Sequence, residues 1–167
     1  HVLNLKDNER GLIQNRFDGV IENVNVALVR TKDLLKIYEE KGDLIFYLNI
    51  REDLGLNQVN KGLQEDINGS FSKYFWCLNN GLTIVCDKFD RKTSSSVFSI
   101  LNPIIINGQQ TLRTLNSCKN SIKNDHYILC KIITNSNINF IEKITETSNS
   151  QTEIKYQDLK SNHILLI

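Results

Sequence analysis

The sequence predicts a single mixed domain of the α/β or α+β class, in which helices pack on a sheet. Its 167 residues are enough for one hydrophobic core. A composition of 40% hydrophobic and 23% charged residues, with a net charge of +1, argues against a disordered chain. Segments with strand and helix patterns alternate irregularly, and the sequence contains no internal repeat of about 20–50 residues. These observations favour a mixed domain over a helix bundle or a sandwich.

The first predicted elements follow one another closely. Apolar residues alternate along Val24–Arg30, which is the pattern of a half-buried strand. Thr31 stands where an N-cap belongs, and the helix after it is expected to end at Gly42. Leu44–Ile50 is apolar and rich in aromatic and β-branched residues, which predicts a buried strand. Asn57 can then cap a further helix.

The dipeptide Asn80-Gly81 is the strongest hairpin signal in the chain, because a type I′ turn needs positive φ at both central residues. Residues 82–86, which follow it, are predicted to form a strand. The stretch 71–78 before it is either the partner strand of that hairpin or a short packed helix. Residues 91–96 are predicted to form a polar loop.

The next elements surround a second Asn-Gly dipeptide. Val97–Ile106 predicts one or two strands around Pro103, the only proline. Asn107-Gly108 breaks this run, and a helix is expected to begin at Gln109–Thr111. Tyr127–Thr134 has a continuous apolar core and predicts another strand.

The two ends of the chain complete the interpretation. Asn137 is expected to cap a helix, and a last helix is expected over residues 152–166. We interpret residues 1–23 as the N-terminal flank of a larger protein and residues 24–167 as its core domain. Because the sequence contains no Met, we interpret the chain as a fragment of a longer protein.

Several classes of protein are disfavoured. No apolar run approaches the length of roughly 18–20 residues that a membrane span needs, and the start does not resemble a signal peptide. The four cysteines form no C-x-x-C pair, which disfavours a zinc site. Three of them, Cys77, Cys86 and Cys130, lie in apolar runs and are expected to be buried, reduced thiols. These features predict a cytoplasmic protein with no metal and no membrane partner.

Three clusters of amides and hydroxyls stand where an element starts or ends: residues 78–84, 106–111 and 147–152. In the second, a strand enters a Gly turn and a helix opens directly after it. The first backbone N–H groups of a helix lack internal partners and attract anions, so this junction predicts a phosphate site. Basic residues surround it in the sequence, namely Arg113, Lys119, Lys123 and Lys131.

Each cluster also has a purely structural interpretation. Gly108 can be an ordinary turn capped by Asn107, and Asn79–Gly81 can be a plain hairpin turn. The third cluster can be a helix end followed by the cap of the next helix. Taken one at a time, the first and third clusters favour these structural interpretations.

The order of short motifs resembles one protein family. These motifs are Asn49-Ile-Arg51, Leu54-Gly55, Val59-Asn60, Phe75-Trp76 with Asn79-Asn-Gly-Leu-Thr83, Pro103 with Ile106-Asn-Gly-Gln-Gln-Thr111, and Ser148-Asn-Ser-Gln151. Together they resemble the AIPR family of bacterial abortive-infection phage-resistance proteins over about residues 24–160. Ser148 departs from the family, which commonly has Thr there. Family members are longer, so the resemblance implies flanking regions that can hold a nuclease or another effector.

A fainter resemblance concerns the second cluster alone. Asn107-Gly-Gln-Gln-Thr111 is similar to the D-G-Q-x-R signature of ParB-like domains, which also follows a strand and opens a helix. The resemblance implies a ParB-like fold that handles DNA or nucleotides. Here Asn107 replaces the acid and Thr111 replaces the arginine, which removes the carboxylate and the guanidinium that hydrolysis would use.

The first functional hypothesis is a phage-defence core domain that binds nucleic acid or a nucleotide in an amide-rich pocket. Asn and Gln side chains contact base edges and phosphates without bringing charge. A net charge of +1 predicts a defined pocket rather than general affinity for duplexes. The expected ligand-binding residues are Arg51, Asn60, Asn79, Asn80, Gly81, Asn107, Gly108, Gln109, Gln110, Thr111, Arg113, Asn149 and Gln151, with Asn49 on the same motif as Arg51.

Two other hypotheses remain open. A metal-dependent nuclease needs carboxylates that converge on Mg²⁺, and the candidates are Glu52, Asp53, Glu65, Asp66 and Asp87. Mg²⁺ is a cofactor only under this hypothesis. A non-catalytic scaffold that senses a phage component would use the amide motifs for turns and caps alone.

Overall fold

The computed structural model describes residues 2–4, 12–16, 23–46, 58–91 and 97–150. Five strands form the larger sheet, in the order β2-β3-β8-β4-β7. The pairs are antiparallel except for β4 and β8, which run parallel. The bounds are β2 Leu12–Arg16, β3 Asn23–Arg30, β8 Tyr127–Thr134, β4 Leu82–Cys86 and β7 Ile104–Asn107.

A second sheet has the order β1-β6-β5 and is antiparallel throughout. Its strands are β1 Val2–Asn4, β6 Val97–Leu101 and β5 Lys88–Arg91. Both β1 and β2 come from the stretch interpreted as an N-terminal flank. Each of them pairs with a strand from the rest of the chain, β1 with β6 and β2 with β3.

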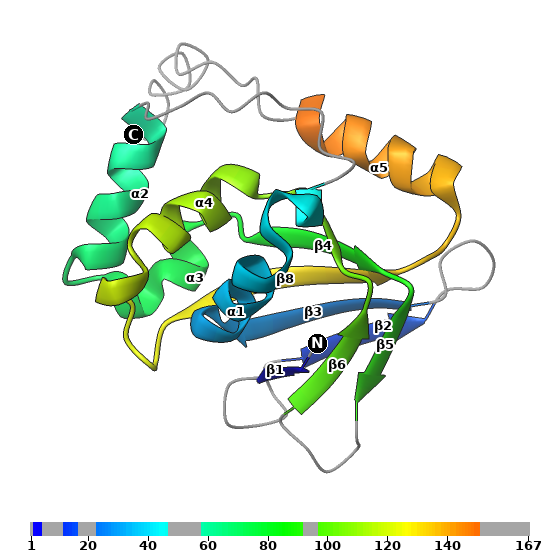
Figure 1. The fold of residues 1–167 in the computed structure, drawn as a ribbon, viewed down its shortest axis with the longest axis horizontal. Helices are drawn as coiled ribbons and strands as arrows, with labels where there is room; N and C mark the ends of the chain where they lie inside the picture. Colours follow the sequence, from blue (N-terminus) through cyan, green and yellow to red (C-terminus); the bar gives the residue numbers. More distant parts are fainter. Residues whose placement is uncertain (1, 5–11, 17–22, 47–57, 92–96, 151–167) are drawn as a thin grey trace, which may run out of the picture.

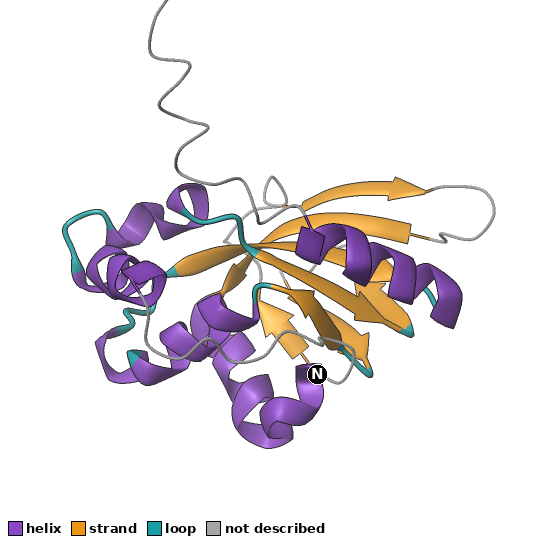
Figure 2. Cartoon of the chain, turned by 90° about the horizontal axis from the view of Figure 1, so that it is seen from above, coloured by secondary structure: helices purple, strands orange, loops and turns teal. Residues whose placement is uncertain are grey.

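Helices surround the strands in the described part of the chain, and α5 lies apart from the other helices (Figures 1 and 2). The α-helices are α1 Thr31–Lys41, α2 Gln58–Asn68, α3 Phe75–Leu78, α4 Gln109–Ser117 and α5 Ile138–Ser150. The 3₁₀ segments are η2 Gly42–Phe46, η3 Ser72–Tyr74 and η4 Lys119–Ser121. The mixed α/β class that the sequence predicts is therefore confirmed.

The larger sheet buries its two faces differently. On the core face, Ala27, Ile84 and Ile132 pack with Leu112 and Leu115 of α4 and with residues of α1 and β6. The opposite face, here called the α5 face, carries the smaller cluster, in which Val85, Ile106 and Ile133 pack against Ile141 of α5. Neighbouring strand residues point to opposite faces, which explains how β4 and β8 contribute to both clusters.

Two of the predicted elements differ from the structure. Asn80-Gly81 is not a hairpin, because residues 75–78 form α3 and the chain passes from a helix into β4. Of the two interpretations of residues 71–78, the packed helix is the one confirmed. Residues 44–46 belong to η2 rather than to a strand, which buries Ile45 and Phe46 side by side and leaves Leu44 exposed. In a short apolar run, the spacing of the apolar residues does not distinguish a helical turn from a strand.

Most of the other predicted elements are confirmed where the structure describes them, but Arg91, predicted to begin a polar loop, is the last residue of β5. The strands at 24–30, 82–86 and 127–134 form, and residues 97–106 give two strands rather than one. Asn137 caps α5, since its Oδ1 accepts hydrogen bonds from the N–H groups of Asn139 and Phe140 at 3.0 and 3.3 Å. Residues 92–96, Asn57, the second part of the 44–50 stretch and the helix at 152–166 lie outside the described residues.

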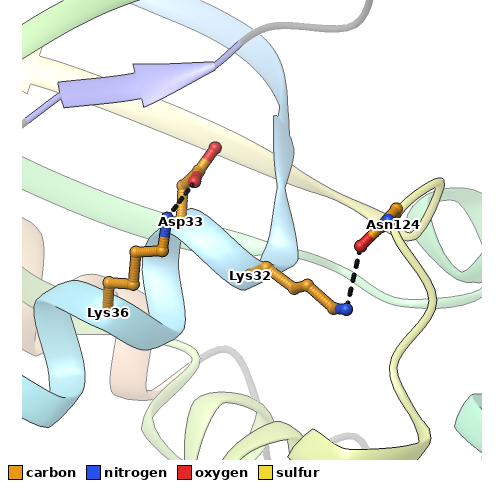
Figure 3. A network of polar contacts seen from close by, with 4 residues as sticks. All are labelled: Lys32, Asp33, Lys36 and Asn124. Atoms are coloured by element: carbon orange, nitrogen blue, oxygen red, sulfur yellow. Dashed lines mark hydrogen bonds and ion pairs between the residues drawn. The ribbon is translucent and has the colours of Figure 1, made fainter.

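The start of α1 depends on a buried histidine rather than on the expected Thr31 cap. The N-cap is Arg30, which makes no side-chain capping bond. The Thr31 hydroxyl instead shares a hydrogen bond of 2.8 Å with Nδ1 of His126, whose ring packs 4.9 Å from that of Phe75. Nearby, Lys32 donates to Asn124 at 2.9 Å, which joins α1 to the loop before β8 (Figure 3).

The cysteines only partly follow the sequence prediction. Cys86 and Cys130 are buried as expected, but Cys77 is exposed. The reason is that residues 75–78 form a helix, which turns Phe75 inward and Cys77 outward. Burial raises the pKa of Cys86 to about 11 and also raises that of Cys130, so neither is a thiolate nucleophile at neutral pH. Within the described residues, no helix is long and apolar enough to cross a membrane.

We expect Asn25→Leu to stabilise the fold. Asn25 lies in β3 with an exposed fraction of 0%, and neither polar atom of its amide has a hydrogen-bond partner in the described part of the chain. A buried unsatisfied amide costs about 1–3 kcal/mol, so urea unfolding should show a gain of that order. Asn25→Ala is the control, because it removes the amide but leaves a void and should gain less. A loss of stability in Asn25→Leu would contradict the expectation.

Candidate amide site at the start of α4

The junction between β7 and α4 has the form that the sequence predicts. Gly108 is the N-cap of α4, with φ 95° and ψ 18°, and no side chain caps the helix. The first helical hydrogen bond runs from the N–H of Leu112 to the Gly108 carbonyl at 3.0 Å. The N–H groups of residues 109–111 come before this bond and therefore have no acceptor within the helix. The helix dipole is positive at this end and favours an anion there.

Asn79 links the first motif to the second. Its Oδ1 accepts a hydrogen bond from the N–H of Gly81 at 2.8 Å, and its Nδ2 donates to Thr111 Oγ1 at 3.5 Å. The backbone N–H of Asn79 in turn donates to the carbonyl oxygen of Phe75 in α3. The carboxamide thus holds the turn before β4 and reaches the first turn of α4, which lies 32 residues further along the chain.

The two Gly turns pack against each other and against β8. A Cβ on Gly108 would overlap the Leu82 side chain and lie 2.8 Å from the Gly81 carbonyl oxygen. A Cβ on Gly81 would overlap the carbonyl oxygen of Leu129, and both glycines have positive φ. Only Gly can occupy these two positions without a rearrangement of the neighbouring chain. The absence of a side chain at both positions lets the Asn79–Gly81 and Asn107–Thr111 motifs pack directly against each other.

Asn107 links the second motif to the third through a β-bulge. The register of β4 and β7 shifts between Thr83 and Ile84, so that Ile106 and Asn107 together oppose Thr83. Such a bulge turns both residues of the longer strand toward one face. Ile106 belongs to the cluster on the α5 face, and Asn107 Nδ2 donates to the carbonyl oxygen of Ser148 in α5 at 3.4 Å.

A family model for the AIPR protein matches residues 46–166, which is well over half of the chain. The chain belongs to the AIPR family. No curated protein and no solved structure matches it. Membership associates the chain with abortive infection and phage defence, as the resemblance of the sequence motifs implies.

The AIPR motifs differ in how closely they approach the start of α4. Asn79, Gly81, Asn107, Gly108 and Thr111 meet there through the contacts described above. Asn80 is exposed at the same turn, and Gln110 is half-buried in the first turn of α4. Asn60 lies in α2 and Asn149 in α5. Asn49, Arg51 and Gln151 lie outside the described residues.

Among the described residues of the AIPR motifs, Gln109 has a buried side-chain atom without a hydrogen-bond partner. Its exposed fraction is 9%, and its Oε1 has no hydrogen-bond partner within the described part of the chain. A buried amide oxygen in that state costs free energy unless a donor reaches it. The first residue of α4 therefore combines backbone donors with a side-chain acceptor.

The basic surroundings predicted for the site are partly neutralised. Arg113 pairs with Asp43 of η2 at 2.9 Å, and its guanidinium lies 5.7 Å from the ring centroid of Phe46. Lys119 pairs with Glu39 of α1 at 2.8 Å. Because Asp43 is 64% exposed, the Arg113 pair is worth little in free energy and chiefly orients the side chain. Asp43 belongs to no motif, so the sequence offers no signal for this pair.

The carboxylates considered for a nuclease do not gather where they are described. Among the described residues, no group of three His, Cys, Asp or Glu side chains is placed to hold a metal ion. Glu65 and Asp66 lie on α2, and Asp87 accepts a hydrogen bond of 2.7 Å from Asn102. Glu52 and Asp53 lie outside the described residues. No feature of the described part therefore favours metal-dependent hydrolysis over binding.

Proposed function

We propose that this AIPR domain acts in bacterial phage defence by binding a nucleotide unit, free or within a nucleic acid, at the start of α4. The observation that supports this most directly is the meeting of three distant motifs. Asn79 contacts Thr111, and Asn107 contacts Ser148, around one helix start that no side chain caps. If the motifs served only turns and caps, each could do so on its own part of the surface.

The chemistry of the site favours a nucleotide over a simple anion. The backbone N–H groups at the start of α4 suit the ionised oxygens of a phosphate, which accept hydrogen bonds. The buried Oε1 of Gln109 needs a donor, which an ionised or esterified phosphate oxygen does not supply. A nucleotide provides both, since its base carries N–H donors beside the phosphate acceptors. Carboxamides are among the side chains that contact base edges in this way.

The proposal predicts that Gln110→Ala and Asn107→Ala weaken nucleotide binding about tenfold or more. Each removes a polar group beside the proposed phosphate position, and a hydrogen bond to a charged group is worth about 1.5–3 kcal/mol. Titration calorimetry with the four ribonucleoside and four deoxyribonucleoside triphosphates measures the effect, and thermal unfolding reports on stability. Asn120→Ala is the matched control, because Asn120 is exposed on η4.

The scaffold hypothesis predicts a different result. If the amides serve only the fold, Asn107→Ala lowers stability by about 1 kcal/mol through the lost contact to α5, and no nucleotide binds to any variant. Binding that is equal in the parent protein and in Gln110→Ala would also contradict the proposal. Sulfate, which carries no O–H donor at neutral pH, should bind more weakly than a nucleotide because it leaves Gln109 without a donor.

A further inference from the structure

Part of the α5 face of the larger sheet is left uncovered by the described helices. At one end of this face, Ile141 of α5 packs on Val85, Ile106 and Ile133. Tyr127 of β8, which pairs with Arg30, is buried at the other end of this face. The remaining residues toward that end are half-buried or exposed. They are Val26, Leu28 and Arg30 of β3, Thr83 of β4, and Leu129 and Lys131 of β8.

The register places this surface next to the proposed nucleotide site. Lys131 pairs with Thr83 across the parallel β8–β4 ladder, and Thr83 pairs with Asn107 across the β4–β7 ladder. Lys131, Thr83 and Asn107 therefore form one row over three adjacent strands. The row ends at the Gly108 turn, where α4 begins. Because strands lie about 4.8 Å apart, Lys131 stands roughly 10 Å from Asn107, within reach of a neighbouring phosphate.

The charge on this surface has a single sign. The described strands β3, β4, β7 and β8 contribute Arg30 and Lys131 to the α5 face and no Asp or Glu. Elsewhere, Lys88, Lys119 and Lys143 each pair with a carboxylate. Neither Arg30 nor Lys131 has such a partner among the described residues, and Arg30 Nε is a buried donor without an acceptor there.

Lys131 and Arg30 are too far apart to bind the same phosphate. Val26 pairs with Lys131, and Arg30 lies four residues further along β3. At about 3.3 Å per residue, the two positions are roughly 13 Å apart along the strand. The half-buried Val26, Leu28 and Leu129 occupy the space between them. One nucleotide cannot contact both cations and the start of α4, whereas an extended chain of several nucleotides can.

We infer that the uncovered part of the α5 face binds a single-stranded nucleic acid, one nucleotide of which occupies the site at α4. Lys131 and Arg30 contact the phosphates, and the apolar residues between them contact sugars and base faces. Proteins that hold single strands without reading their sequence combine a positively charged groove with side chains, usually aromatic, that contact the faces of the bases. On this face the contact surface between the cations is aliphatic and consists of Val26, Leu28 and Leu129. This inference rests on the proposed function and identifies its ligand as a polynucleotide.

The experiment compares a fluorescein-labelled 12-nucleotide poly(U) or poly(dT) strand with mononucleotides at several salt concentrations. We expect Lys131→Ala to weaken binding of the strand at least about fivefold. The slope of log affinity against log salt should fall by about 0.7, the value for one phosphate contact on a single strand. Mononucleotide binding should stay unchanged in this variant. Lys61→Ala is the matched control, since Lys61 is exposed on α2.

Arg30→Ala gives an independent measurement and should also reduce the salt slope. Since Arg30 precedes α1, the thermal unfolding of this variant is measured as well, and Arg30→Gln replaces it where Arg30→Ala is unstable. If mononucleotides bind, but the strand binds no better and Lys131→Ala has no effect, this inference is wrong and the proposed function stands. If neither ligand binds, the proposed function is wrong. Equal competition by poly(Glu) would show a general anion surface and would also overturn the inference.

Discussion

Replacing Gly81 by alanine is expected to lower the free energy of unfolding by about 3 kcal/mol or more. Gly81 has φ +76°, and a Cβ there would overlap the carbonyl oxygen of Leu129 in β8. The oxygen belongs to the backbone of a strand that pairs with both β3 and β4, so it cannot move without disturbing the sheet. Urea unfolding measures the loss, which combines backbone strain with a steric overlap.

Two other glycines separate these causes. Gly42 has φ +57° and ψ −146°, but a Cβ added there would meet no atom within 4 Å, so Gly42→Ala should cost only the backbone strain of about 1–3 kcal/mol. Gly62 lies within α2 in open space, and Gly62→Ala should stabilise the helix by about 0.5–1 kcal/mol. A Gly81→Ala variant no less stable than Gly42→Ala would show that the close approach to β8 is absent in solution.

The second large effect is a loss of stability on acidification caused by His126. Burial lowers the pKa of His126 from 6.5 to about 4, with a smaller opposing effect from Asp125. Between these two values the unfolded chain binds a proton that the folded chain does not. Stability is therefore fully present above pH 6.5 and falls as the pH is lowered toward 4. The difference amounts to about 3 kcal/mol, at 1.36 kcal/mol for each pKa unit.

A double variant isolates this contribution from general acid denaturation. Thr31→Val/His126→Phe replaces both partners of the 2.8 Å hydrogen bond by apolar groups, which avoids leaving one of them unsatisfied. Its unfolding free energy, measured in urea from about pH 7.5 to 4, should fall less steeply than that of the parent protein. If the two curves run parallel over this range, His126 is not the group that titrates on unfolding.

The fold could be predicted where the sequence has a clear period or a clear stop. The alternation in β3, the apolar run of β8 and the Asn137 cap of α5 are local signals, and the structure confirms each of them. The hairpin predicted at Asn80-Gly81 is wrong. An Asn-Gly dipeptide indicates only that a residue adopts positive φ, and Gly81 does so in the turn between a helix and a strand. The strands β1 and β2 have no period of their own, since their positions depend on pairing with β6 and β3.

For the candidate site, the sequence indicates which motifs matter but not their contacts. The resemblance to the AIPR family groups the three amide motifs, and the helix start at Gln109 follows from Gly108. The Asn107 contact to Ser148 depends on a β-bulge, which no residue in the sequence predicts. The pairing of Arg113 with Asp43 joins positions 70 residues apart, which only the tertiary structure reveals. The binding role itself stays a prediction.

The bulge in β7 makes the number of residues in this segment as important as their identity. Deleting one of residues 104–106 would restore regular alternation, so that Asn107 and the residue before it would face opposite sides of the sheet. The α5 helix would then lose the apolar contact of Ile106 even though Asn107 and every other amide of the motif were still present. In homologous sequences, we therefore expect insertions and deletions to be excluded from this stretch, while the polar stretch 92–96 tolerates them.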